Sequence, residues 1–87
     1  MTHTVTWKQS AADRFAEVWM TAPDRAAVAS AADMLDAALR ADPHHQGESR
    51  GGKMRLVVVP PLAVVYEVLE ADCLVERLAI RYTATRR

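Results

Sequence analysis

The strongest constraint on the fold comes from the second half of the chain, residues 51–82. Three apolar runs rich in β-branched residues are separated by Pro60-Pro61 and by Ala71-Asp72. The runs are Met54–Val59, Leu62–Leu69 and Cys73–Tyr82. Short β-branched runs bounded by turn residues are typical of strands. This half therefore predicts a three-stranded antiparallel meander.

The first half predicts one strand followed by two helices. Polar and apolar residues alternate over residues 2–8, which indicates a half-buried strand. Two sets of apolar residues then recur at helical spacing. They are Phe15, Val18, Trp19 and Ala22, and Val28, Ala31, Ala32, Leu35 and Leu39. The short link Thr21–Asp24 favours an antiparallel helix hairpin. We therefore expect an α+β fold with the hairpin on one face of the sheet.

Length and composition indicate a single domain spanning residues 1–87. The formal net charge is zero, whereas a free-standing nucleic-acid-binding domain usually has a clear basic excess. The one cysteine, Cys73, excludes an internal disulfide and fits a reducing cytoplasm. The longest apolar stretch is broken by two prolines and is too short to span a bilayer, so we expect no membrane association.

Arginines recur on the predicted strands, where a purely apolar core would exclude them. We expect Arg55, Arg77 and Arg81 on the uncovered face of the sheet, with Arg50 and Lys53 in the loop before it. Such a set could bind a phosphodiester. An ordinary solvated sheet face, neutralised by nearby glutamates, explains the same pattern equally well.

No motif predicts a metal or a cofactor. His44 and His45 are adjacent in a polar loop and no set of Cys and His residues accompanies them, so solvated side chains are the favoured interpretation. Residues 47–53, GESRGGK, match part of a phosphate-binding loop, but Met54 follows where Ser or Thr would be needed. Trp7, Phe15 and Trp19 are expected to be core aromatics.

The order of these elements resembles the RelE/ParE superfamily of bacterial toxins from type II toxin–antitoxin modules. The likeness covers nearly the whole chain. It is carried by Trp7-Lys8, by the second helix running into Asp42-Pro43, by Gly47-Glu48-Ser49, by Arg55-Leu56-Val57, by Pro61 to Val68 and by Ile80-Arg81.

The superfamily includes metal-independent messenger-RNA endonucleases, in which basic side chains stabilise charge on phosphate while a base activates the ribose 2′-hydroxyl. By resemblance, Arg55 and Arg81 match phosphate-facing positions, Glu48 could act as the base, and Tyr82 lies near a terminal aromatic position. Two positions differ from the pattern. Ala63 stands where an arginine is common, and Thr83 rather than histidine follows the last strand.

The resemblance is compatible with three functions. The chain could be a toxin that cleaves mRNA at the ribosome, a non-nucleolytic inhibitor of DNA gyrase, or a degenerate toxin fold that only binds its antitoxin. In each of the three, the resemblance implies a cognate antitoxin as partner, and we expect it to be small, acidic and partly disordered.

Overall fold

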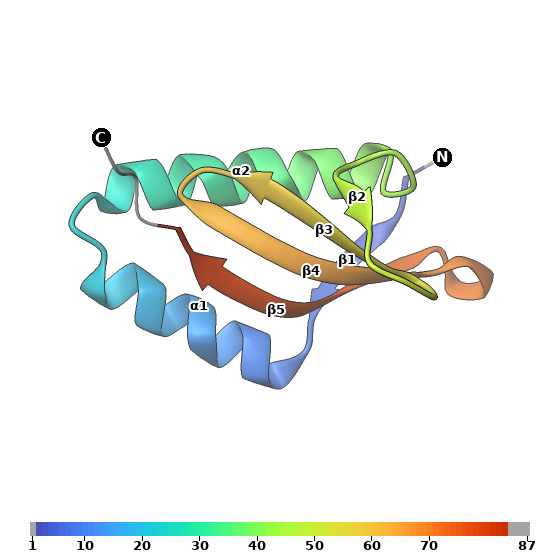
Figure 1. Cartoon of the computed structure of the whole chain (residues 1–87), viewed down its shortest axis with the longest axis horizontal. Helices are drawn as coiled ribbons and strands as arrows, with labels where there is room; N and C mark the ends of the chain where they lie inside the picture. The colour runs from blue at the N-terminus through green and yellow to red at the C-terminus, as the bar shows by residue number, and fades with distance from the viewer. Residues whose placement is uncertain (1, 84–87) are drawn as a thin grey trace.

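The computed structural model describes residues 2–83, which form a sheet of five strands with two helices packed on one face (Figure 1). In chain order the elements are β1 (Thr4–Trp7), α1 (Gln9–Thr21), α2 (Arg25–Ala41), β2 (Glu48–Ser49), β3 (Met54–Val59), β4 (Leu62–Leu69), the 3-10 turn η1 (Glu70–Asp72) and β5 (Leu74–Tyr82). Neither described helix is both long and apolar enough to cross a membrane.

The sheet has the strand order β1-β5-β4-β3-β2. Its centre is the predicted meander, because β3 pairs antiparallel with β4 and β4 pairs antiparallel with β5. Two pairings at the edges go beyond the sequence-based expectation. The N-terminal strand β1 lies parallel to β5, and the two-residue strand β2, inside the segment expected to be a loop, pairs with β3.

The core lies between the helices and the face of the sheet that they cover. Leu62, Val64, Tyr66 and Val68 alternate along β4 and are all buried. They meet the apolar stripe of α2, in which Val28, Ala31, Leu35 and Leu39 are buried as predicted. Helix α1 lies along β5 and contributes Val18.

The helical spacing predicted that Trp19 lies in the core, and this prediction is wrong. Trp19 is 39% exposed, and it lies in a surface hollow between the helices rather than in the core. Helix α1 packs mainly on β5, so the side of α1 that carries Trp19 has no strand beneath it. Phe15 and Trp7 do pack against the core, with their ring centroids 5.3 Å apart.

A β-bulge in β5 changes which residues face the helices. The register with β4 shifts between Val65 and Tyr66, so that Val65 pairs with Ala79 while Tyr66 pairs with Arg77. Leu78 is the extra residue. As a result Arg77 shares the covered face with Ile80 and is buried. The strict alternation assumed from the sequence placed Arg77 beside Arg81, and that placement is wrong.

Candidate functional site

The uncovered face of the sheet carries an open groove of about 570 Å³. Five small or branched apolar side chains from β3, β4 and β5 line it, namely Leu56, Val58, Ala63, Val65 and Ala79. Two arginines, Arg50 and Arg81, also line it, and Ile80 and Thr83 complete the lining. Arg50 follows β2 and Arg81 lies on β5, so the arginines come from opposite sides of the central strands β3 and β4.

Arg50 and Glu48 form an ion pair at the side of this groove. Their Nη2 and Oε2 atoms are 3.1 Å apart, and both side chains are more than half exposed. Glu48 pairs with Leu56 in the sheet register, which places it on the same face as the groove. An exposed ion pair contributes little to stability, so an anionic ligand could replace Glu48 as the partner of Arg50.

Arg81 lies opposite Ala63 on the groove side of the sheet and is exposed. Within residues 2–83, no acidic side chain forms an ion pair with it. The small side chain of Ala63 leaves the space beside the guanidinium open. Among the sequence-predicted site residues, Arg50, Glu48 and Arg81 are therefore the three that the structure brings together at the groove.

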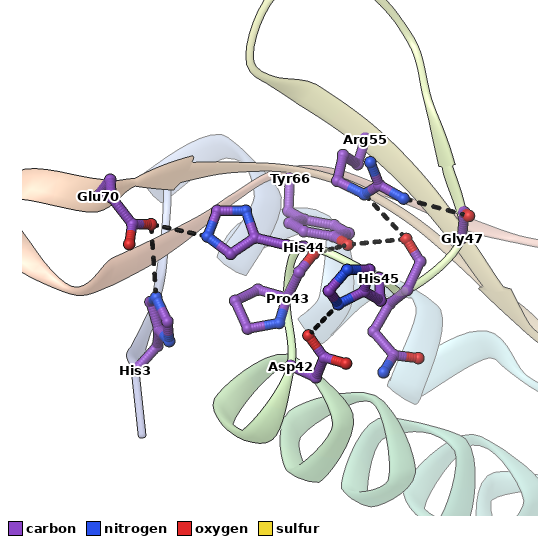
Figure 2. A network of polar contacts seen from close by, with 10 residues as sticks. His3, Asp42, Pro43, His44, His45, Gly47, Arg55, Tyr66 and Glu70 are labelled. Atoms are coloured by element: carbon purple, nitrogen blue, oxygen red, sulfur yellow. Dashed lines mark hydrogen bonds and ion pairs between the residues drawn. The ribbon is translucent and has the colours of Figure 1, made fainter. Parts of the chain in front are cut away.

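Arg55 faces the other side of the sheet, so its predicted placement on the uncovered face is wrong. Strand β3 buries Val57 against the helices, and Arg55, two residues earlier in the strand, faces the same side of the sheet. Its guanidinium donates from Nε to the carbonyl of Gln46 at 3.0 Å and from Nη2 to the carbonyl of Gly47 at 3.3 Å. Arg55 thus holds the loop between α2 and β2 (Figure 2).

Tyr66 on β4 also holds this loop through hydrogen bonds. Its hydroxyl lies 2.7 Å from the carbonyl oxygen of Pro43 and 3.0 Å from that of Gln46, and it donates to these acceptors. Burial raises the pKa of Tyr66 above its ordinary value, although the neighbouring Arg55 opposes the shift. The hydroxyl therefore stays protonated and keeps its role as a donor.

Gly47 is required in this loop for a steric reason. It has φ of +60°, and a Cβ atom there would collide with the backbone of Leu56 and Val57. The close approach of backbone to backbone is what lets β2 pair with β3, and it thereby positions Glu48 and Arg50 beside the groove.

Arg77 has a structural environment. Its guanidinium lies 3.8 Å from the ring centroid of Trp7, donates from Nε to the carbonyl of Thr6 at 3.1 Å and lies 3.7 Å from Asp36. Burial lowers the pKa of Arg77 to about 10, while Asp36 acts in the opposite direction. An arginine stacked on an indole and covered by helices cannot reach a phosphodiester outside the sheet.

Tyr82 and Lys53 also lie away from the groove. Tyr82 is half-buried and packs against the core cluster, on the same side as Ile80. Lys53 is exposed in the turn before β3, where it lines a small surface hollow together with His44 and Arg55. The chemical roles that the resemblance implies for Tyr82, Arg55 and Glu48 remain predictions.

Sequence reasoning missed two polar residues that the fold brings to this loop. His3 and Glu70 meet His44, and these three are the described side chains close enough to share one metal ion. No spacing rule could have found them, because they come from three segments far apart in the chain.

The comparisons with known proteins identify the fold. No protein-family model matches the chain, and no curated protein matches it. Solved structures do match. A chain of the RelBE2 toxin–antitoxin complex from Mycobacterium tuberculosis superposes with a TM-score of 0.80 at 12% identity, over 98% of this chain and 95% of that one. This protein has the RelE/ParE fold.

Two further structures agree. The isolated RelE toxin of E. coli matches with a TM-score of 0.71 at 10% identity, over 98% of this chain and 88% of that one. The chromosomal ParDE system of P. aeruginosa matches with a TM-score of 0.65 at 13% identity, over 94% and 97%. The RelE/ParE fold that the sequence predicted is thus confirmed, including the strand, two helices and antiparallel strands in order.

Proposed function

We propose that this protein is the toxin of a type II toxin–antitoxin module, that it acts in the cytoplasm, and that the open groove is its working surface. The observation that carries the proposal is an apolar groove on the uncovered sheet face with Arg50 and Arg81 on its two sides. The match to RelBE and ParDE structures along nearly the whole chain supports it. By the same likeness, its partner is a cognate antitoxin.

The groove favours inhibition by binding over cleavage. Two arginines and an apolar lining suit an extended acidic segment or a phosphodiester chain, because each charge-assisted contact contributes about 1.5–3 kcal/mol. Cleavage would need further basic groups at the groove. Arg77 is stacked on Trp7, and Arg55 is bonded to loop carbonyls. A gyrase-directed or similar protein target is therefore the first candidate.

Metal-independent mRNA cleavage at the ribosome is the second candidate. It is favoured by the Glu48–Arg50 pair, in which a carboxylate lies beside a guanidinium at the groove. In this alternative Glu48 would act as the base toward the ribose hydroxyl, and Arg81 would stabilise charge on the phosphate.

One experiment separates the two candidates. The chain is expressed from an inducible promoter in a bacterium without its antitoxin, and labelled amino-acid incorporation and plasmid supercoiling are followed over the first minutes. Inhibition by target binding at gyrase predicts altered supercoiling before translation falls, whereas mRNA cleavage predicts an immediate fall in translation that Glu48→Gln abolishes. Unchanged growth, translation and supercoiling would contradict both.

A further inference from the structure

Three potential metal ligands meet at the end of the molecule where the α2–β2 loop begins (Figure 2). His3 precedes β1, His44 lies just after α2, and Glu70 opens the turn between β4 and β5. One ligand atom from each lies within 4.8 Å of the other two. The Glu70 Oε1 atom is central, since it lies 2.7 Å from His44 Nε2 and 3.8 Å from His3 Nε2.

The imidazole of His3 lacks a partner that its burial demands. Its side chain is only 12% exposed, and neither Nδ1 nor Nε2 has a hydrogen-bond partner. The 3.8 Å separation from Glu70 is too long for a hydrogen bond. Buried polar atoms are almost always satisfied, so an unpartnered imidazole pointing at a carboxylate and a second imidazole indicates a missing ligand.

We propose that His3, His44 and Glu70 bind a divalent transition-metal ion, with Zn²⁺ the best match. Two imidazole nitrogens and one carboxylate oxygen are donors that zinc accepts, whereas Mg²⁺ and Ca²⁺ prefer oxygen donors alone. His44 is half-exposed and Glu70 is exposed, so water can reach a fourth coordination position.

The distances need only small adjustment to fit zinc. Zinc–nitrogen and zinc–oxygen bonds of about 2.0–2.2 Å in a tetrahedron place neighbouring ligand atoms about 3.4 Å apart. The 2.7 Å contact between His44 and Glu70 must lengthen, and the 3.8 Å contact between His3 and Glu70 must shorten. Moving the exposed carboxylate of Glu70 makes both changes. The two histidine nitrogens lie within 4.8 Å of each other and must also approach to about 3.4 Å, which the half-exposed side chain of His44 can do by rotating.

The ion would join three segments that lie far apart in the sequence. The amide of His3 donates to the carbonyl of Arg40 at 2.9 Å, which already ties the start of the chain to the end of α2. A shared ion would also fix the turn that carries Glu70 and the loop that carries His44. Because an ion that binds the folded state stabilises it, zinc should raise the melting temperature.

The test uses the tag-free full-length chain, purified in the presence of a chelator and then dialysed. Titration calorimetry with ZnCl₂ should show one site. Melting in free Zn²⁺ near 100 times the Kd should raise Tm by about 10–20 °C, and Mg²⁺ should not. Co²⁺ should give the visible absorption of a four-coordinate complex, a readout independent of stability.

Three variants and two controls decide the site. His3→Ala, His44→Ala and Glu70→Gln should each weaken zinc binding by at least about 100-fold. His45→Ala should bind as the wild type does, because His45 is 81% exposed and contacts Asp42 instead. Cys73→Ser tests the one cysteine of the chain, which directly follows the turn Glu70–Asp72.

Because Glu70 is exposed, Glu70→Gln should fold normally, and circular dichroism confirms this before the titration. Absence of zinc binding by the wild-type chain would overturn the proposal. Zinc binding that is retained in both Glu70→Gln and His3→Ala would also overturn it. Loss of zinc binding in Cys73→Ser or His45→Ala, with binding retained in Glu70→Gln and His3→Ala, would place the site elsewhere and overturn it as well.

Discussion

At the residue scale, the role of each arginine follows from the acceptors within its reach. Arg55 finds the carbonyls of Gln46 and Gly47, and Arg77 finds the carbonyl of Thr6. Both guanidinium groups therefore hold segments of backbone in place through hydrogen bonds. Arg81 has no ion-pair partner within residues 2–83, and it remains able to bind a ligand.

Tyr66→Phe should lower the free energy of unfolding by about 1–2 kcal/mol at pH 8, because it removes a buried donor to the loop carbonyls. The raised pKa of Tyr66 adds a pH dependence. The unfolded chain loses this proton near pH 10 while the folded chain keeps it, so wild-type stability falls as pH rises above 10. Tyr66→Phe should lack this component.

Urea unfolding at pH 8 and at several values above pH 10 measures both effects. Tyr82→Phe serves as the control, because Tyr82 is only half-buried at the edge of the core. Equal loss of stability in the wild type and in Tyr66→Phe above pH 10 would contradict the assignment.

The side of the sheet that a residue faces could be predicted from the sequence where side chains alternate regularly along the strand, and not where a bulge interrupts the alternation. Alternation holds between Ile80 and Tyr82, and both side chains face the core. The face expected for Arg77 was wrong, because the extra residue Leu78 exchanges the two faces of the strand for the residues that precede it. A single sequence does not show at which residue of a strand a bulge lies.

At the element scale, helices and meander strands were predictable because their periodicity extends over many residues. The stripe of α2 and the alternation of β4 each repeat several times. β2 has two residues and no period to detect. The parallel pairing of β1 with β5 joins Thr4 to Leu74, and it depends on the packing of the whole fold rather than on local pattern.

The two helices offer a matched test of the packing. Leu35→Ala should lower the free energy of unfolding by about 2–5 kcal/mol, because Leu35 on α2 is almost fully buried. Trp19→Ala should cost much less, because the ring on α1 is 39% exposed and has no strand beneath it. Chemical denaturation of both variants checks this, and a larger loss for Trp19→Ala would contradict the placement of α1.

At the scale of the whole molecule, a net charge of zero conceals an uneven uncovered face. Arg50 and Arg81 lie at the groove, while Glu67 and Glu76 pair directly across β4 and β5 elsewhere on the same face. The overall balance therefore says little about the groove. The candidate site depends on this separation, which only the register of the strands reveals.

The proposed function has one most direct test, the growth of a bacterium that expresses the chain without antitoxin. The double variant Arg50→Ala, Arg81→Ala removes both groove arginines. Arg14→Ala is the matched control, because Arg14 pairs with Glu17 on α1 and is 52% exposed, close to the 53% of Arg50. Protein levels and melting temperatures are compared for all three.

We expect the wild type and Arg14→Ala to arrest growth and the folded double variant to restore it. Loss of two charge-assisted contacts weakens ligand binding by at least about 100-fold. Full growth arrest by the folded double variant would contradict the assignment of the groove. Normal growth with the wild-type chain at the same protein level would contradict the toxin function itself.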